Sequence, residues 1–178
     1  MELLDILNED GTVSGVVKER SQVHRDGDLH RTSHVWIARK NKKSGMDILL
    51  QKRSHNKDSY PECYDISSAG HIVAGSGFLD SAIRELEEEL GLKVEKEELI
   101  LKGTRRFHIE EIFHGNLFCD NQLSNVYLLW RDFDEKELTL QIEEIESVRW
   151  MDLEECMHGV ENKTFPNCIF LEELKMLV

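Results

Sequence analysis

Most of this chain is predicted to form β-strands, because its apolar residues either alternate with polar ones or gather in short runs. In Ser33–Arg39, Val35 and Ile37 alternate with polar neighbours, and Asp47–Lys52 and Ser124–Trp130 contain the apolar runs of buried strands. The other predicted features are a strand at Thr12–Glu19, a polar loop that contains Gly27, a hairpin turn at Lys40–Gly45, one or two strands in Ile100–Phe113, a turn at Gly115 and a strand at Ser147–Met151.

The segment Ser76–Leu92 is predicted to form an amphipathic helix, because apolar residues recur at i, i+4, i+7 and i+11. These residues are Leu79, Ile83, Leu86 and Leu90. Ser76 or Asp80 is the predicted N-cap, and Gly91 suits the C′ position. Further helices are predicted at about Asp152–His158 and, as an amphipathic closing helix, at Cys168–Leu177. Strands interspersed with two or three helices favour an α/β domain whose mixed sheet is covered by helices.

Length and composition fit one globular domain and narrow the classes of function. The chain has 178 residues, of which 40% are hydrophobic, enough for one sizeable core. Its 22 basic and 35 acidic residues give a formal net charge of −13, which argues against an extended nucleic-acid-binding face. We expect no membrane span, because no apolar run approaches roughly 20 residues, and no signal peptide. The four cysteines form no CxxC pair, so reduced thiols in a cytoplasmic protein are expected.

Three glutamates lie on one flank of the predicted helix, within an arc of about 100°. They are Glu85, Glu88 and Glu89. Like charges three or four residues apart destabilise a helix by roughly 0.2–0.5 kcal/mol per pair. A bound divalent cation would reverse that effect. From this spacing alone, the cluster is either a solvated acidic face or a ligand set for the hard cations Mg²⁺ and Mn²⁺.

The residues around this cluster closely resemble the Nudix box, whose family pattern is G-x5-E-x7-R-E-U-x-E-E-x-G-U, with U a bulky aliphatic residue. Gly70 provides the first glycine, and Arg84–Leu92 reads RELEEELGL, which matches every later fixed position. Ser76 stands where the family has its first glutamate. The resemblance extends from about His34 to His158. It implies a Nudix-like α/β/α sandwich with a mixed sheet, as one domain over residues 1–178, with the box at 70–92 and an N-terminal strand and loop extension at 1–30.

The resemblance also implies metal-dependent hydrolysis of a phosphoanhydride bond in a nucleoside diphosphate linked to another group. Glu85 would hold Mg²⁺ (or Mn²⁺) and help to activate water, and Glu88 and Glu89 would complete the carboxylate cluster. The carbonyl oxygen of Gly70 would be a further ligand, and Arg84 would orient the glutamates. The implied partner is a small phosphoanhydride substrate. The oligomeric state stays open, with a homodimer among the options.

Three residues outside the cluster are candidate substrate contacts: Arg53, Lys57 and His71. Arg53 and Lys57 would contact phosphate, or else they are ordinary surface charges. His71 would hydrogen-bond either a phosphate or the core. Glu110 and Glu111, in the long strand region, are candidates for an additional base.

Within the family, the sequence looks most like the branch related to isopentenyl-diphosphate isomerase. Ala69 stands where the isomerase has its essential cysteine, and Gln122 replaces one carboxylate of its Glu-x-Glu, so an isomerase-like enzyme is a weaker alternative. A ligand-binding pseudoenzyme, weakened at Ser76 and Gln122, is another. The residues that carry the resemblance are Lys57, Pro61, Tyr64-Asp65, Ala69-Gly70-His71, the segment His24–Arg31 and Asp120-Asn121-Gln122.

The paired histidines of the isomerase imply an alternative second metal site. His24, His30 and His71, together with Asp120, would supply imidazole and carboxylate ligands that suit Zn²⁺, Mn²⁺ or Fe. In the other interpretation, His24 and His30 are polar loop residues, and His71 hydrogen-bonds the core or a phosphate. The loss of a carboxylate at Gln122 favours this second interpretation.

Overall fold

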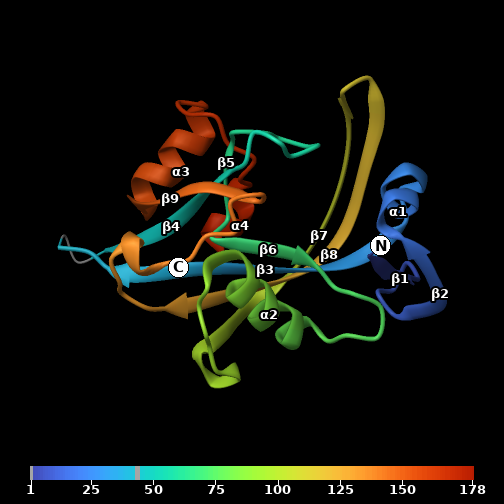
Figure 1. The fold of residues 1–178 in the computed structure, drawn as a ribbon, viewed down its shortest axis with the longest axis horizontal. Helices are drawn as coiled ribbons and strands as arrows, with labels where there is room; N and C mark the ends of the chain where they lie inside the picture. Colours follow the sequence, from blue (N-terminus) through green and yellow to red (C-terminus); the bar gives the residue numbers. More distant parts are fainter. Residues whose placement is uncertain (1, 43–44) are drawn as a thin grey trace.

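A central mixed sheet organises the computed structural model, which describes residues 2–42 and 45–178. Its strands in the described residues are β3 (Leu29–Lys40), β4 (Met46–Arg53), β5 (Tyr64–Asp65), β6 (Ser68–His71), β7 (Leu99–Phe113), β8 (Asn116–Trp130) and β9 (Ile145–Asp152). The strand order is β5-β4-β3-β8-β7, with β6 paired to β3 and β9 paired to β4 (Figure 1). β3 and β8 run parallel, whereas the other pairs are antiparallel.

A small antiparallel sheet and several helices surround the central sheet. The small sheet consists of β1 (Leu3–Leu7) and β2 (Val13–Glu19). The α-helices of the described residues are α1 (Arg20–Asp26), α2 (Phe78–Leu90), α3 (Leu153–Asn162) and α4 (Leu171–Lys175), and short 3-10 helices lie at Lys96–Glu98 and Glu135–Glu137. Within the described ranges, none of the helices combines the length and apolar character needed to cross a membrane.

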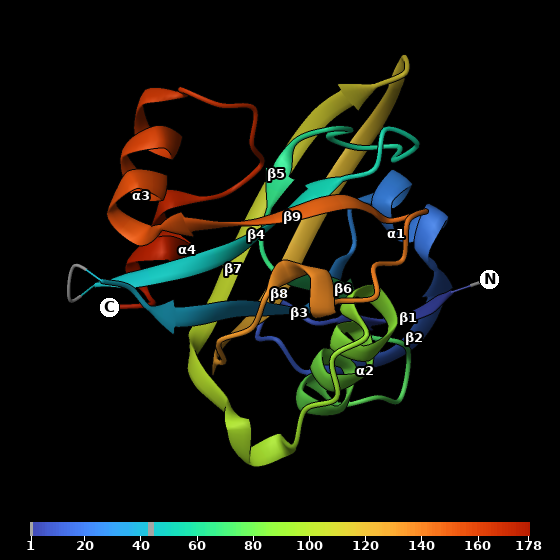
Figure 2. The same cartoon turned by 60° about the vertical axis from the view of Figure 1, so that its left-hand side comes forward.

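Helices cover both faces of the central sheet, and β3 shows this most clearly. Val35 and Ile37 belong to a buried cluster with residues of α2, whereas Trp36 and Ala38 belong to a second cluster with residues of α3 and α4. Figure 2 shows α2 on one side of the sheet and α3 and α4 on the other. Because successive side chains of a strand point to opposite faces, β3 is buried on both. The predicted α/β/α arrangement with a mixed sheet is therefore confirmed.

The helix α2 follows the sequence prediction except at its first residues. Gly77 is the N-cap, so the prediction of Ser76 or Asp80 is wrong. The helix ends at Gly91, whose φ of 69° lies in the left-handed region that glycine adopts at low cost, as predicted.

Other differences concern short or polar segments. The polar loop predicted around Gly27 is wrong over residues 20–26, which form α1, because this helix has too few apolar residues to show a period. Ile100–Phe113 forms part of one continuous strand, and the predicted turn at Gly115 is confirmed. The closing helix covers only Leu171–Lys175, and β1, β5 and β6 were not predicted. Residues 43–44 of the predicted hairpin turn lie outside the described residues, although β3 and β4 pair on either side of them.

Leu86→Ala is expected to lower the free energy of unfolding by about 2–5 kcal/mol. Leu86 is fully buried between α2 and the sheet, so the shorter side chain would leave a cavity. Urea denaturation followed by circular dichroism measures the loss. Leu79→Ala on the same helix is the matched control, because Leu79 is only partly buried. An equal loss in both variants would contradict a core position for Leu86.

Candidate functional site

A cavity of about 670 Å³ opens beside α2, and we call it the central cavity. Its wall includes residues of α2, β3, β4 and β6, and aromatic residues of the β7–β8 hairpin. The box residues singled out for catalysis and metal binding all line it: Gly70, Arg84, Glu85, Glu88 and Glu89. The fold therefore gathers these polar groups at one concave surface, as an enzyme site requires.

The three glutamates of the cluster, Glu85, Glu88 and Glu89, differ in how deeply they are buried. Glu89 is 7% exposed and accepts a hydrogen bond from Ser68 Oγ at 2.6 Å. Its burial raises the pKa of the carboxyl to about 8. Burial also raises the pKa of Glu85, although Arg84 donates a 2.6 Å hydrogen bond to its Oε1. Glu88 is largely exposed, with Oε2 at 3.8 Å from Arg84 Nε. A cation bound here would favour the charged form of the buried carboxylates.

Gly70 brings the backbone of β6 against the Glu85 side chain. A Cβ atom at position 70 would lie 2.4 Å from Glu85 Cδ, which is closer than atoms can approach. The absence of a side chain at Gly70 therefore lets the Glu85 carboxylate pack directly against this strand. That contact brings the backbone of Gly70 close to the Glu85 carboxylate.

The predicted phosphate contacts line the central cavity, but each cation already has a carboxylate partner. Arg53 Nη1 donates to Asp65 at 3.0 Å, and Lys57 forms an ion pair with Glu144. They are therefore not ordinary surface charges, since Arg53 and Lys57 are largely buried. A phosphate group would have to share these cations with the carboxylates.

Two carboxylates of the cavity were missed by sequence reasoning. Glu2 lies near Glu85 and helps to raise the pKa of its carboxyl, after the larger effect of burial. Glu144 belongs to an acidic run just before a predicted strand, but no local pattern connects it with the box. Of the described residues, Ser76, Glu110 and Glu111 are not among those that line the cavity.

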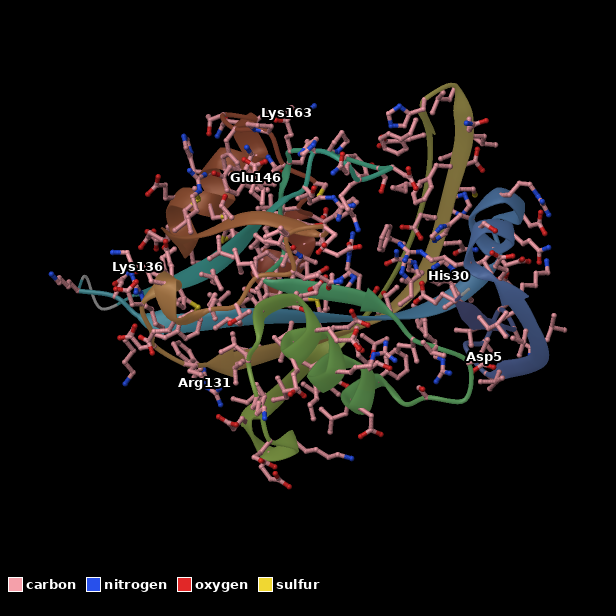
Figure 3. The ribbon with its side chains drawn as sticks, viewed as in Figure 1. Asp5, His30, Arg131, Lys136, Glu146 and Lys163 are labelled. Carbon is pink, nitrogen blue, oxygen red and sulfur yellow. The ribbon has the colours of Figure 1, made fainter. Side chains whose placement is uncertain are left out.

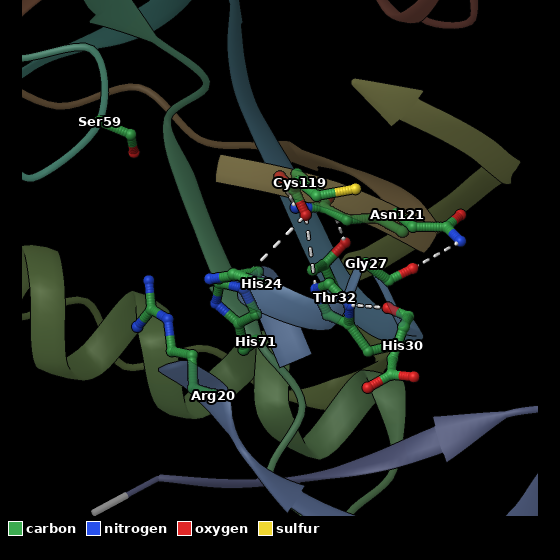
Figure 4. A network of polar contacts seen from close by, with 12 residues as sticks. Arg20, His24, Gly27, His30, Thr32, Ser59, His71, Cys119 and Asn121 are labelled. Carbon is green, nitrogen blue, oxygen red and sulfur yellow. Dashed lines mark hydrogen bonds and ion pairs between the residues drawn. The ribbon is translucent and has the colours of Figure 1, made fainter. Parts of the chain in front are cut away.

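Three histidines from different elements lie close together (Figure 4): His24 of α1, His30 of β3 and His71 of β6. His24 Nε2 lies 3.1 Å from His71 Nε2, and Asp120 Oδ1 lies 3.8 Å from His24 Nε2 and 3.5 Å from His30 Nε2. Figure 3 shows His30 where the central sheet meets the N-terminal elements. Both His24 and His30 are buried, so the interpretation of these two as polar loop residues is wrong.

The three histidines of this cluster favour the neutral form. Burial lowers the pKa of His24 to about 3, and it also lowers the pKa of His30 and His71. His30 Nδ1 donates to the Asp28 carbonyl at 2.9 Å, which leaves a lone pair on Nε2. His30 Nε2 and Asp120 Oδ1 are both buried without a hydrogen-bond partner. Neutral imidazoles and a carboxylate gathered in this way could hold a transition-metal ion.

Gln122 has a role that the sequence did not reveal. Its Nε2 donates to Asp120 Oδ2 at 2.6 Å, and its Oε1 accepts from Thr32 Oγ1 at 3.1 Å. The amide therefore fixes the Asp120 carboxylate with Oδ1 directed to the histidines. Gln122 therefore acts through Asp120 and does not itself contact the three histidines in the hydrogen bonds that it forms.

Comparison with known proteins gives consistent matches. The NUDIX domain profile matches residues 28–168. Nudix hydrolase 3 of Arabidopsis thaliana is 43% identical over 156 residues, or 86% of this chain, which spans only 20% of that relative's length. An isopentenyl-diphosphate Delta-isomerase of Saccharopolyspora erythraea is 27% identical over 152 residues, which cover 85% of this chain and 73% of that protein. A Deinococcus radiodurans crystal structure with a TM-score of 0.71, 18% identity and 98% coverage of both chains has the same fold.

Proposed function

The chain belongs to the Nudix family, and we propose that it is a metal-dependent pyrophosphohydrolase that cleaves a phosphoanhydride bond in a nucleoside diphosphate linked to another group. The observation that carries the proposal is the carboxylate cluster of Glu85, Glu88 and Glu89 in the central cavity. Carboxylates with elevated pKa in a cleft are typical of sites that bind cations or transfer protons.

In the proposed reaction, the three glutamates hold Mg²⁺ or Mn²⁺, and the Gly70 carbonyl is a further ligand. Bound cations of this kind polarise phosphate oxygens and lower the pKa of water. Glu85 helps to activate the attacking water, and Arg84 keeps Glu85 in place through their 2.6 Å hydrogen bond. Arg53 and Lys57 share their charge with the substrate phosphates.

A turnover screen tests the proposed function. Purified protein with Mg²⁺ or Mn²⁺ would be offered nucleoside di- and triphosphates, sugar nucleotides, dinucleotides and coenzyme A, with isopentenyl diphosphate in a separate reaction. Release of phosphate or of a nucleoside monophosphate supports the hydrolase. Binding without turnover points instead to a pseudoenzyme, and double-bond migration without phosphate release points to an isomerase.

Binding of Mg²⁺ at pH 7 is expected to release about one proton from the protein. The pKa of Glu89 is about 8 in the metal-free protein, so this carboxyl is mostly protonated at pH 7 and must ionise to become a ligand. Affinity for Mg²⁺ should therefore rise as pH increases toward 8. Calorimetry in buffers of different ionisation enthalpy counts the protons released.

Glu89→Gln is the variant that assigns this proton, because the amide cannot ionise. Proton release should disappear in Glu89→Gln and persist in Glu87→Gln, since Glu87 is exposed on the other flank of α2. Unchanged proton release in Glu89→Gln would show that another group titrates on metal binding.

We also propose a second metal site formed by His24, His30, His71 and Asp120. The supporting observations are the neutral histidines and the two buried atoms without a hydrogen-bond partner, His30 Nε2 and Asp120 Oδ1. Nitrogen ligands favour Zn²⁺, Mn²⁺ or Fe at this place, whereas the carboxylates of α2 favour Mg²⁺. The low pKa of His71 fits a neutral metal ligand better than a cationic phosphate contact.

A further inference from the structure

His34 lies in the wall of the central cavity, where Glu173 of α4 holds its ring. His34 Nδ1 is 3.0 Å from both carboxylate oxygens of Glu173. Trp36 Nε1 donates to Oε1 of this carboxylate at 2.9 Å, and Arg105 Nη1 donates to Oε2 at 3.3 Å. Glu173 is 1% exposed and His34 is 6% exposed. The buried carboxylate is thus saturated with donors, and the imidazole has a fixed orientation.

The protonation of this pair favours an imidazolium beside a carboxylate. Burial lowers the pKa of His34, but the charge of Glu173 and its hydrogen bond outweigh burial, so the pKa lies above its ordinary value. Burial raises the pKa of Glu173, but His34 and the hydrogen bonds from His34 and Trp36 outweigh it, so that pKa lies below its ordinary value. Glu173 therefore engages Nδ1–H of His34, and in the imidazolium form that this pair favours the second proton lies on Nε2.

The Nε2–H group of His34 is poorly satisfied within the protein. Its contact with Thr32 Oγ1 measures 3.4 Å, longer than the usual range of about 2.7–3.2 Å for such a hydrogen bond. Thr32 Oγ1 is also engaged with Gln122 and with Ser124, at 3.1 and 2.6 Å. A ligand oxygen in the cavity would therefore be a better acceptor for this proton than the threonine.

The ratio of positive to negative groups at Glu173 differs from that in the other ion pairs of the cavity. Among the described residues, one lysine and three arginines line the cavity. Each of those is matched by a carboxylate, in the pairs Arg20–Glu2, Arg53–Asp65, Lys57–Glu144 and Arg84–Glu85. Glu173 instead faces Arg105 and the ring of His34, whose cationic form the charge of Glu173 favours. The other carboxylates that act on His34 are Asp65, which is paired with Arg53, and Asp120, which Gln122 holds beside the neutral His30. With His34 protonated, the group of His34, Arg105 and Glu173 carries one net positive charge.

We propose that His34 is an anion-binding residue of the central cavity and that it donates its Nε2–H to a phosphate oxygen of a diphosphate ligand. Glu173 is the positioning residue, since it orients the ring and keeps the proton on it. Arg105 adds charge from a fixed place, with its guanidinium 4.5 Å from the ring centre of Phe107 and 4.2 Å from that of Phe170. The choice of a diphosphate rests on the proposed function, but anion binding does not require turnover.

Nuclear magnetic resonance of the histidine side chains tests the proposal in the intact protein. Imidodiphosphate, which resists hydrolysis of its bridging bond, would be titrated at constant Mg²⁺ concentration. The ¹⁵N signals of His34 are expected to shift on binding, and its pKa should rise further in the complex. The affinity for imidodiphosphate should fall as pH increases through the pKa of His34, because the ring then loses the donated proton. Unmoved His34 signals at saturation would overturn the proposal without the need for a variant.

His34→Gln is expected to weaken imidodiphosphate binding about tenfold or more and to flatten its pH dependence, because a charge-assisted hydrogen bond is lost. His158→Gln, at an exposed histidine of α3, is the matched control and should bind normally. Equal affinity and an equal pH profile in His34→Gln and the wild-type protein would contradict the proposal. A chain that binds imidodiphosphate through His34 but hydrolyses nothing in the turnover screen would support anion binding and refute the hydrolase, whereas turnover with unmoved His34 signals would do the reverse.

Discussion

Glu85→Gln is expected to lower kcat by about 100-fold or more on any phosphoanhydride that the wild-type protein hydrolyses. Glu85 is half-buried in the central cavity and packs against the backbone of Gly70, so its carboxylate is held where the cations are proposed to bind. The amide keeps the size and the hydrogen-bonding ability of the side chain, but it loses the charge that a cation needs. Steady-state kinetics over a range of Mg²⁺ concentrations measures both kcat and the metal requirement.

Glu87→Gln is the matched control for this experiment. Glu87 lies on the same helix, is exposed, and has Lys93 at 3.9 Å as its ion-pair partner, so its loss should leave kcat nearly unchanged. Thermal unfolding of both variants should resemble that of the wild-type protein. Should Glu85→Gln retain the wild-type kcat and Mg²⁺ dependence, Glu85 would have no part in metal binding or water activation.

His24→Gln is expected to weaken Zn²⁺ binding by about 100-fold or more, because loss of a direct ligand costs at least as much as loss of its supporting contacts. His24 Nε2 lies 3.1 Å from His71 Nε2 and 3.8 Å from Asp120 Oδ1, so it faces two of the three other groups of the proposed site. Competition with a chromophoric chelator measures the affinity for Zn²⁺. Affinity should change little as pH decreases just below 6.5 and should fall only toward the lowered pKa values of the imidazoles, about 3 for His24.

His55→Gln serves as the control for the histidine site, because His55 is exposed and outside the cluster. It should leave Zn²⁺ affinity unchanged, and the Mg²⁺ response of the carboxylate cluster should be intact in both variants. Zn²⁺ binding by His24→Gln with wild-type affinity would place the zinc elsewhere and refute the proposed second site.

The sequence by itself determined the features that depend on neighbouring residues. The helix α2 was predicted because its apolar residues follow the helical period, and its end at Gly91 was predicted because a left-handed residue favours glycine. The Nudix box is equally local, since its fixed positions lie within the single segment from Gly70 to Leu92. Even within the box, the sequence did not reveal that Glu89 is buried and Glu88 exposed, because this difference depends on how β6 packs against α2.

Only the tertiary structure decided which distant side chains meet. His24 comes from α1, His71 from β6 and Asp120 from β8, and β3 brings them together because it pairs with both β6 and β8. Glu173 reaches His34 because α4, near the opposite end of the chain, packs against the face of the sheet that contains Trp36. Hydrophobic periods record only whether a residue faces the core, whereas strand register and helix docking determine its partner there. The pKa of each buried group depends on those partners and on the water they exclude, so the His34–Glu173 pair could not be recognised from the sequence. The members of the histidine cluster were named only through the family resemblance, which did not reveal their burial or their distances.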